Sequence, residues 1–411
     1  MSNKVSGTII APPSKSMAQR AIAAALLANG TTRIFLGTHA EDIEASIRIV
    51  SALGAKVTSD GSNCIAVTGG LSPVSEEIDC GEAGLSMRMF SSIAALSPKK
   101  LKLVGRGSLE TRPMKAVEEF LVGLGATVSL NGELPPISIQ GPIKPGRISI
   151  DGSLSSQFLT GLLLALPTLP GDTTLDVRNL KSKPYVEMTL ELIADFGVKI
   201  EHNSELSNFF IPGNQKYLAR DYKVEGDWSG ASFLAVAGAI AGEVTIENLR
   251  TDSKQADRRI VDAILAFGAL LTSLEHSLKI KKSSNKSFTF DATECPDLFP
   301  PLVALAANAN GVSKIKGVHR LKHKESDREN ALTSEFKKLG IKIQTEEDYL
   351  VVVGGPITGG KVFSHYDHRI AMALAVAGLN ASGAVEIEQP ECVAKSYPDF
   401  YKDLESLKVK L

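Results

Sequence analysis

The 411-residue chain has almost no net charge: 45 Lys and Arg residues against 46 Asp and Glu residues give −1 at pH 7. Proteins that bind nucleic acid or anionic membrane surfaces usually carry a broad excess of positive charge. This composition therefore argues against both partners. Any cationic binding site has to be local, built from a few residues gathered in one cleft.

Cysteine is scarce, and long hydrophobic runs are missing. The four cysteines, Cys64, Cys80, Cys295 and Cys392, are far apart in sequence and form no metal-binding pair, which is typical of reduced thiols in the cytosol. The longest apolar stretch, residues 158–170, is interrupted by proline and too short to span a bilayer, and no signal-peptide pattern opens the chain. We therefore expect a cytoplasmic protein with no membrane partner.

What the chain does have is enough apolar residues for large cores. Hydrophobic residues make up 43% of the sequence and charged residues 22%, as in globular proteins. A length of 411 residues exceeds what one ordinary core organises, so two domains are expected.

A repeat runs through the whole sequence. Leu-Gly-Ala at Gly54, after an amphipathic stretch, returns in variant form at Gly125, Gly197, Gly268 and Gly340, with spacings of 71, 72, 71 and 72 residues. Lys408 takes the place of the glycine 68 residues later. A regular period of this kind indicates repeated supersecondary units, and each glycine is expected to end a helix.

Each repeat also contains a helix of small apolar residues that begins with a polar head. A helix without a polar face is a buried one. The six segments are 14–30, 81–97, 152–167, 226–242, 294–311 and 366–383, and β-branched or alternating strands separate them.

The repeats predict an α/β fold of two inside-out domains, in which helices lie inside and strands outside. Each domain would hold three βαβαββ units, six in all, with the hinge near residues 225–227. Residues 14–225 would form the first domain, and residues 1–13 with 226–411 the second. A binding ring without chemistry has the same repeat signature, so the repeat alone does not give a function.

Cationic and hydroxyl side chains gather at several of these helix heads. Lys15 and Arg20 open the first helix, and residues 155–157 (Ser-Ser-Gln) open the third. A helix N-terminus presents free N–H groups and the positive end of its dipole, so such heads suit anions. Taken singly, Lys15 is also compatible with a solvated surface lysine, and Ser155 with an ordinary N-cap.

Acidic residues with possible roles in proton transfer occur in the second half of the chain. Glu325 lies in residues 322–328 (KHKESDR), and Asp297 heads the fifth buried helix. Glu325 could donate a proton, although a salt-bridged first helical turn gives the same pattern. His319 with His323 and His365 with His368 have metal-ligand spacing, but no cysteine or paired acid completes a site, so we expect no metal.

Together these motifs resemble the enolpyruvyl transferase family. The resemblance covers essentially the whole chain and rests on residues 14–16 (SKS), 151–163 (DGSLSSQFLTGLL), 182–185 (SKPY), 324–328 (KESDR), 366–372 (YDHRIAM) and 394–399 (AKSYPD). It implies transfer of the enolpyruvyl group of phosphoenolpyruvate to the 5-hydroxyl of shikimate 3-phosphate, with release of phosphate, in aromatic amino-acid biosynthesis. It also implies a monomer without cofactor and a chain that crosses the hinge twice.

The resemblance assigns residues to each substrate. Those that match positions holding shikimate 3-phosphate are Lys15, Ser16, Arg20, Ser155, Ser156, Ser182, Tyr185, Asp297 and Lys324. Those that match positions around phosphoenolpyruvate are Lys15, Gly84, Arg112, Gln157, Arg328, Arg369 and Lys395. It further implies that Asp297 deprotonates the 5-hydroxyl, that Glu325 protonates the methylene carbon, and that Lys15 acts as acid or base near the leaving phosphate.

The chain departs from the family pattern at the second helix head. Glu82 and Leu85 stand where the family usually has asparagine and threonine, while Arg88 is retained. Pro13 also stands where a small residue commonly precedes the Ser-Lys pair. Two other functions remain open at this point. One is the sister transferase that acts on a UDP-amino sugar, and the other is a catalytically silent sensor of phosphorylated metabolites.

Overall fold

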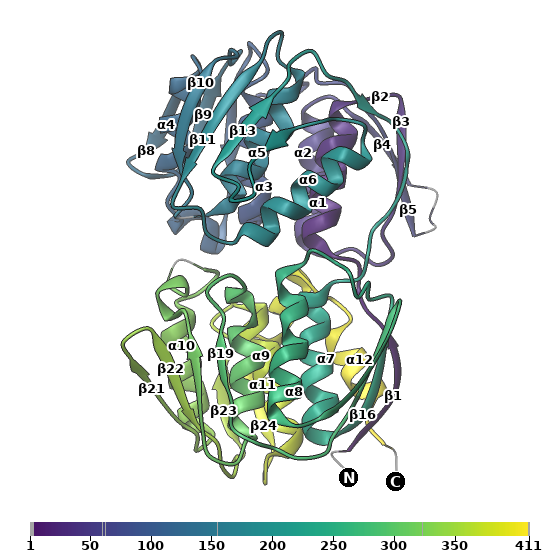
Figure 1. The fold of residues 1–411 in the computed structure, drawn as a ribbon, viewed down its shortest axis with the longest axis vertical. Coiled ribbons are helices and arrows are strands. Elements are labelled where there is room, and N and C mark those ends of the chain that lie inside the picture. Colours follow the sequence, from purple (N-terminus) through teal and green to yellow (C-terminus); the bar gives the residue numbers. More distant parts are fainter. Residues whose placement is uncertain (1–3, 60, 62, 154, 323, 410–411) are drawn as a thin grey trace. The chain divides into compact units, whose positions relative to one another are not determined.

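The structure, a computed structural model, describes residues 4–59, 61, 63–153, 155–322 and 324–409 (Figure 1). The chain divides into two compact units. The first unit is Lys15–Val224, and the second combines Met1–Ser14 with Glu225–Leu411. The chain therefore passes from the second unit into the first and back again, as the resemblance implies.

Both crossings lie next to each other in the second unit. Pro13 and Gly226 form an antiparallel bridge. The Ser14 amide donates to the Glu225 carbonyl at 2.7 Å, and the Asp227 amide donates to the Pro12 carbonyl at 2.8 Å. The double crossing is thus a short two-stranded connection at residues 12–14 and 225–227.

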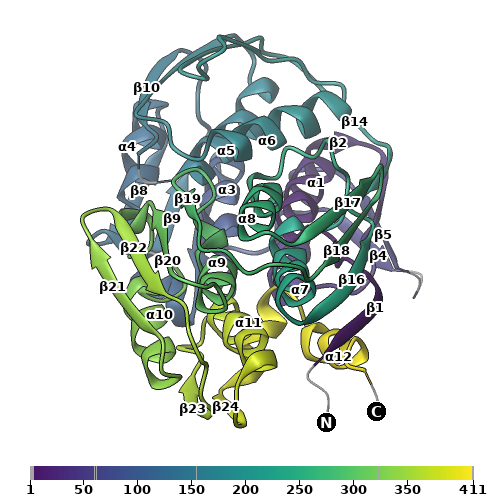
Figure 2. The same cartoon turned by 60° about the horizontal axis from the view of Figure 1, so that its bottom comes forward.

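Each unit is built around three buried helices. In the first unit these are α1 (Lys15–Leu27), α3 (Gly84–Ala94) and α5 (Ser156–Ala165), and in the second unit α7 (Trp228–Ala241), α9 (Phe299–Ala307) and α11 (His368–Ala377). Every residue of α3 and α7 is buried. Helices without a polar face pack on all sides, as the sequence predicts. Figures 1 and 2 show α7, α9 and α11 side by side, with strands around them.

In the described part of the chain, six more helices form at the amphipathic segments. They are α2 (Glu41–Ala52), α4 (Lys115–Gly123), α6 (Lys183–Asp195), α8 (Ile260–Phe267), α10 (Arg328–Lys338) and α12 (Phe400–Ser406). The periodic glycines at 54, 125, 197, 268 and 340 follow the first five of these helices, and all have φ between +80° and +108°. This left-handed conformation favours glycine and ends a helix, so the expected helix-ending role is confirmed.

Within the described residues, five four-stranded sheets share one topology: a parallel pair, followed by two strands added antiparallel. Three of these sheets lie in the first unit, and their strands in order are β15 (Asp221–Lys223), β3 (Thr31–Phe35), β5 (Cys64–Thr68) and β4 (Lys56–Ser59); β6 (Glu77–Asp79), β7 (Lys100–Val104), β9 (Leu134–Gln140) and β8 (Thr127–Asn131); and β10 (Arg147–Asp151), β11 (Thr173–Arg178), β13 (Asn208–Ile211) and β12 (Glu201–His202). The other two lie in the second unit, with the strand orders β1 (Val5–Ile10), β16 (Gly242–Glu247), β18 (Ser277–Lys281) and β17 (Leu270–Leu274); and β19 (Thr289–Asp291), β20 (Val312–Lys316), β22 (Tyr349–Val353) and β21 (Lys342–Glu346). A short parallel pair, β2 (Ala28–Asn29) and β14 (Tyr217–Leu218), adds to the first unit.

The sixth repeat is shorter than the expected βαβαββ unit. Its sheet has two parallel strands, β23 (Gly360–Phe363) and β24 (Val385–Glu388). After α12 the described chain forms no hairpin; Lys408 instead bridges Val5 of β1 antiparallel. The last repeat thus extends the sheet of the fourth one.

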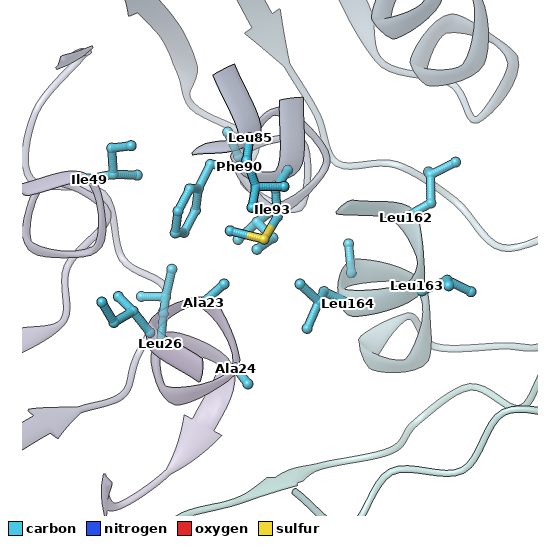
Figure 3. Close-up of a cluster of buried hydrophobic side chains, with 14 of the residues drawn as sticks. Ala23, Ala24, Leu26, Ile49, Leu85, Phe90, Ile93, Leu162, Leu163 and Leu164 are labelled. Atoms are coloured by element: carbon cyan, nitrogen blue, oxygen red, sulfur yellow. The ribbon is translucent and has the colours of Figure 1, made fainter. Parts of the chain in front are cut away.

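The core of the first unit lies between its three buried helices. Leu26 of α1, Phe90 and Ile93 of α3, and Leu164 of α5 are all buried (Figure 3). A Cβ on Gly161 of α5 would lie 2.6 Å from the Met89 carbonyl oxygen, so only glycine allows this approach of α5 to α3.

Among the described residues, every helix is too short or too polar to span a membrane.

A second set of periodic glycines closes the hairpins against the buried helices. At Gly69, Gly141 and Gly354, which directly follow the hairpin strands β5, β9 and β22, a Cβ would collide with a backbone carbonyl oxygen at the end of the neighbouring buried helix. Gly355, by contrast, has nothing within 4 Å of the position of a Cβ. Backbone cannot move aside as a flexible side chain does, so the close approach requires glycine.

We predict that Gly354→Ala lowers the free energy of unfolding of the second unit by about 2–3 kcal/mol, because the added methyl overpacks a fixed backbone contact. Gly355→Ala, the adjacent control, should change it by less than about 0.5 kcal/mol. Trp228, the single tryptophan, is buried in α7 of the second unit. Its fluorescence during urea unfolding therefore measures this unit. Equal midpoints for the two variants would contradict the prediction.

Candidate active site

In the first unit, Arg20 is a buried cation that pairs with no acid among the described residues. Its side chain projects from α1 and is 1% exposed. The guanidinium donates to the Thr189 hydroxyl at 2.9 Å and to the backbone oxygens of Ser16 at 2.8 Å and Tyr185 at 3.3 Å, and no described carboxylate pairs with it. Burial lowers the pKa of Arg20 to about 10. A desolvated guanidinium held only by neutral acceptors is prepared to bind an anion.

The head of α5 carries the other predicted hydroxyl and amide groups. Ser155 is the N-cap, and its hydroxyl accepts from the Gln157 amide at 3.2 Å. The Gln157 side chain accepts from Arg88 of α3 at 2.8 Å, which joins two helix heads. Ser156 is buried at the first position of α5. Ser182 caps α6 in the left-handed conformation, with φ of 57°.

Lys15 is not the solvated surface lysine that its local sequence also allows. Its side chain is only 12% exposed, and its ammonium lies 2.8 Å from a carboxylate oxygen of Asp42 on α2. A partly buried lysine at the start of α1, held by Asp42, is a fixed cation at a helix N-terminus. Asp42 is a partner that the sequence analysis did not single out.

Gly84 and Arg112 fit each other closely. A Cβ at Gly84 would lie 2.5 Å from a guanidinium nitrogen of Arg112, so glycine at the start of α3 makes room for that side chain. Arg112 is buried and follows the 3₁₀ helix η1 (Gly107–Thr111). Pro113 is of a residue type favoured at the first position of a helix, but it lies two residues before α4, which begins at Lys115.

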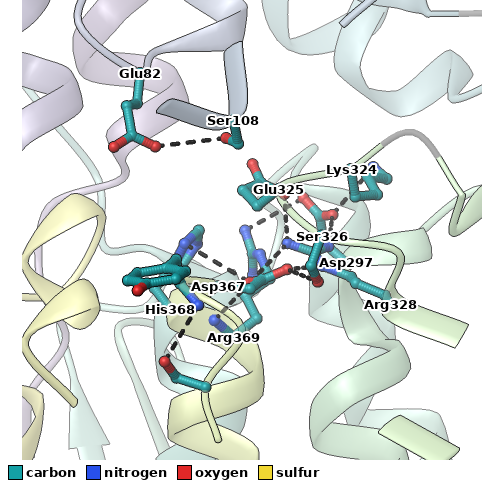
Figure 4. Close-up of polar contacts among 12 residues, drawn as sticks. Glu82, Ser108, Asp297, Lys324, Glu325, Ser326, Arg328, Asp367, His368 and Arg369 are labelled. Carbon is teal, nitrogen blue, oxygen red and sulfur yellow. Dashed lines mark hydrogen bonds and ion pairs between the residues drawn. The ribbon is translucent and has the colours of Figure 1, made fainter. Parts of the chain in front are cut away.

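Glu82, the unusual acid of the second head, lies beside η1. The Ser108 hydroxyl donates to its carboxylate at 3.5 Å (Figure 4). A Cβ at Gly107 would lie 2.6 Å from the same carboxylate, and Gly107 has a φ of 56°. Leu85 is buried in α3 and packs into the core of the first unit. The two departures thus have different environments: Glu82 is polar and bonded, whereas Leu85 is a core residue.

In the second unit, the side chain of Arg328 joins three carboxylates. Arg328 begins α10 and is fully buried. It donates to Asp297 at 2.8 Å, to Glu325 at 2.6 Å and to Asp367 at 2.8 and 3.3 Å (Figure 4). Burial alone lowers the pKa of this guanidinium, but the acids, Asp367 first, raise it above its usual value. Arg328 therefore stays charged and fixes the positions of all three acids.

The carboxylate of Asp297 forms ion pairs with three cations. It lies in the 3₁₀ helix η4 (Pro296–Leu298) rather than capping α9, and its two oxygens contact Lys324 at 3.1 Å, Arg328 at 2.8 Å and Arg369 at 3.2 Å. Burial works to raise the pKa of Asp297, but Arg369, Lys324 and Arg328 hold it well below its usual value. Burial also lowers the pKa of Lys324. The result is a compact group of alternating charges.

Arg369 and Lys395 complete the predicted residues of the second unit. Arg369 is buried in α11, and besides Asp297 it donates to the Ser229 hydroxyl of α7. Lys395 is buried at the end of η7 (Pro390–Lys395), which packs against α11. Asp297, Lys324, Glu325, Arg328 and Arg369 thus form one connected cluster, and Lys395 lies on a neighbouring element.

The structure adds residues that the sequence analysis missed. Asp367 caps α11 by accepting from the Arg369 amide at 2.9 Å, and it also accepts from the Ser326 hydroxyl at 3.0 Å. An aspartate directly before a buried helix was the signal available for it. Thr160 and Thr189 around Arg20 gave no such signal, because hydroxyls inside helices are common.

The histidine pairs do not form a metal site among the described residues, and His323 lies outside them. His319 contacts Asp348 at 2.7 Å, and His365 contacts Glu335 at 2.9 Å. His368 is buried at the start of α11. His319 and His365 are therefore each held by a carboxylate outside the predicted pairs.

We predict that Asp367→Asn lowers the free energy of unfolding of the second unit by about 3 kcal/mol, because it removes a charged partner from fully buried Arg328. Urea unfolding followed by Trp228 fluorescence measures this loss. Glu386→Gln, a substitution of an exposed acid on β24, is the matched control and should cost less than about 0.5 kcal/mol. An Asp367→Asn protein as stable as this control would contradict the structural role of the buried pair.

The comparisons with known proteins agree on one family. The family model for EPSP synthase (3-phosphoshikimate 1-carboxyvinyltransferase) matches residues 1–404. A protein named 3-phosphoshikimate 1-carboxyvinyltransferase from Clostridium novyi (strain NT) is 38% identical to this chain over 417 residues, and one of the same name from Clostridium perfringens (strain 13 / Type A) is 38% identical over 410 residues. Both matches cover 98% of this chain and 96% of the relative.

Solved structures give the same result. The 2.37 Å structure of EPSP synthase from Acinetobacter baumannii matches with a TM-score of 0.83 at 27% identity, covering 99% of this chain and 96% of that chain. A second structure of EPSP synthase from Acinetobacter baumannii matches with a TM-score of 0.81 at 26% identity, covering 99% and 98%. The family and the two-domain α/β fold expected from the sequence are confirmed. This chain belongs to the EPSP synthase (3-phosphoshikimate 1-carboxyvinyltransferase) family.

Proposed function

We propose that this protein transfers the enolpyruvyl group of phosphoenolpyruvate to the 5-hydroxyl of shikimate 3-phosphate and releases phosphate. The observation that carries the proposal is the cluster around Arg328, in which Asp297, Lys324, Glu325 and Arg369 meet at the positions of the family's motifs. Both substrates are multiply charged anions, and the cluster supplies fixed cations for them together with two acids for proton transfer.

The reaction is an addition followed by an elimination. The 5-hydroxyl oxygen attacks C2 of phosphoenolpyruvate and loses its proton, while the C3 methylene gains a proton and becomes a methyl group. The tetrahedral adduct then loses phosphate from C2 and a proton from C3, which restores the enol double bond. No oxidation or reduction occurs, so the proposed reaction needs no redox cofactor.

We assign the anion-binding groups of the first unit to shikimate 3-phosphate. Arg20 is the central cation, because no described acid pairs with its buried guanidinium and a phosphate would supply the negative charge. We add as hydroxyl donors Ser16 of α1, Ser155 and Ser156 at the start of α5, and Ser182 and Tyr185 at the start of α6. In the second unit, Asp297 and Lys324 would receive the shikimate ring hydroxyls.

We assign phosphoenolpyruvate to cations of both units. The proposed ligands in the first unit are Lys15, Gln157, and Arg112 with the adjacent Gly84. Those in the second unit are Arg328, Arg369 and Lys395. Several fixed guanidinium groups match the carboxylate and the phosphate of this substrate. The same cations would stabilise the negative charge of the tetrahedral adduct.

Asp297 is the proposed base for the 5-hydroxyl. In the free protein, Arg369, Lys324 and Arg328 hold its pKa well below the usual range, so it is ionised. When substrate anions share these cations, their pull on Asp297 weakens and its proton affinity rises. The ion cluster thus keeps Asp297 ionised in the free protein, and the proton affinity of Asp297 rises only when substrates are bound.

Glu325 is the proposed acid for the C3 carbon, and Lys15 assists the leaving phosphate. Glu325 is held by Arg328 at 2.6 Å, with its side chain 17% exposed, so its orientation is set while solvent is largely excluded. Lys15, at the head of α1, is similarly held by Asp42. We further propose that residues 14–225 and residues 1–13 with 226–411 act as the two domains of a cytoplasmic monomer.

The direct test of the function is phosphate release measured with purified protein. We predict release when phosphoenolpyruvate and shikimate 3-phosphate are both present, and only background release when either is omitted. Binding of both substrates without turnover would identify the catalytically silent sensor instead. Turnover with a UDP-amino sugar as acceptor would identify the sister transferase.

We predict that Lys15→Met and Glu325→Gln each lower kcat at least about tenfold, because each removes a proton-transfer group without removing packing volume. Lys56→Met and Glu386→Gln, at exposed positions on β4 and β24, are the matched controls and should keep the wild-type rate. Steady-state phosphate release measures all four variants. A wild-type kcat in either first variant would refute the role assigned to that residue.

A further inference from the structure

Asp257 is a buried acid that the proposed reaction does not use. It lies in the 3₁₀ helix η3 (Ala256–Arg259), directly before α8, and is only 3% exposed. One of its oxygens, Oδ1, is buried and hydrogen-bonds to no described residue. A buried carboxyl with an unsatisfied oxygen is costly, so its position calls for a physical reason.

The reason lies in a hydrogen-bonded connection to the active-site cluster. The Ser229 hydroxyl accepts a hydrogen bond from Nη1 of Arg369 and is hydrogen-bonded to the Asp257 carboxyl. The other terminal nitrogen of Arg369, Nη2, lies 3.2 Å from Oδ2 of Asp297. Arg369 is therefore held on one side by Asp297 and on the other, through Ser229, by Asp257.

Hydrogen bonds to the start of α7 fix the segment before Asp257. The Gln255 side chain accepts from the Trp228 amide at 3.0 Å and donates to the Gly226 carbonyl at 2.8 Å. The Gln255 amide in turn donates to the Ser253 hydroxyl at 3.1 Å. These contacts hold η3 against the head of α7, so Asp257 and Ser229 keep one arrangement.

We propose that Asp257 is a positioning residue for Arg369, that it acts through Ser229, and that its charge sets how tightly Arg369 binds the carboxylate of phosphoenolpyruvate. This inference rests on the proposed function, since it takes Arg369 to be a phosphoenolpyruvate ligand. Protonated Asp257 leaves the guanidinium to Asp297 and the substrate. Ionised Asp257 adds a second negative charge that competes with the substrate for the same cation.

The surroundings allow this change of charge near neutral pH. Burial, then Asp297 in η4 and Asp227 before α7, raise the pKa of Asp257, whereas Arg369 in α11 and the Ser229 hydrogen bond lower it; together they bring it to about 7. Cys295, before η4, also faces it, and Arg258 and Arg259 lie on η3 itself. Because the carboxyl is neutral below this pKa and charged above it, substrate affinity should fall as the pH rises.

The test is KM for phosphoenolpyruvate between about pH 6 and pH 8.5, in the wild type and in Asp257→Asn, which keeps the shape and cannot ionise. We predict that the ratio of the wild-type KM to that of Asp257→Asn rises about three- to tenfold across this range, with its midpoint near pH 7, because a unit charge near the binding guanidinium appears in the wild type alone. The ratio cancels the titration of the substrate's own phosphate. The kcat ratio should stay constant.

Two more variants separate positioning from a purely structural role. Ser229→Ala removes the connecting hydroxyl and should show a weaker pH dependence of KM than the wild type. Asp262→Asn removes an exposed acid one turn away, on α8, and should follow the wild type at every pH. A KM ratio that does not change with pH, or a loss in kcat alone, would overturn the inference. Absence of phosphate release by the wild type would instead overturn the proposed function.

Discussion

The buried guanidinium of Arg328 is the constraint on which the second unit depends. Removing a guanidinium from water costs several kcal/mol, and this cost is offset only if carboxylates surround it with good geometry. Asp297, Glu325 and Asp367 come from three different elements, and each must lie within hydrogen-bonding distance of one side chain. The fold therefore has to bring the heads of α9, α10 and α11 together. The same requirement places the two acids of the proposed reaction next to each other.

The two units hold their charges in different ways. In the first unit, Arg20 is buried among hydroxyls and backbone oxygens, so its positive charge is left for a ligand. In the second unit, acids and cations alternate, and each charge is compensated before a substrate arrives. An uncompensated cation favours tight anion binding, whereas a compensated cluster can change its proton affinities when anions enter. This difference agrees with binding as the main role of Arg20 and proton transfer as the main role of Asp297 and Glu325.

The scaffold that makes this possible is a repeat of glycine-limited contacts. Buried helices made of small residues approach one another closely, as Gly161 shows against α3. Glycines at the hairpin ends let strands approach the carbonyl ends of the same helices. Because these contacts involve backbone, the helix heads are fixed with little freedom, and side chains at those heads inherit that precision. The departures Glu82 and Leu85 fit this scaffold: Leu85 joins the core, and Glu82 bonds to Ser108 of the neighbouring η1.

Local signals in the sequence were sufficient for the repeats, the buried helices and most candidate residues. Periodic glycines mark helix ends because only glycine readily takes φ near +90°, and all-apolar helices indicate burial by themselves. Local sequence did not determine the strand pairing at the end of the sixth repeat. Lys408 could pair with the sheet of its own repeat or with β1, which is remote in sequence, and it pairs with β1.

The partners of each charge were also decided by tertiary structure. Lys15 meets Asp42, Arg328 meets Asp367, and Asp257 reaches Arg369 through Ser229, all across elements far apart in the chain. A sequence shows which residues can ionise, but a pKa depends on burial and on neighbouring charges. The sequence by itself therefore determined the fold class, the family resemblance and the residue types of the site, whereas only the folded chain decided which charges compensate one another and which remain available to a substrate.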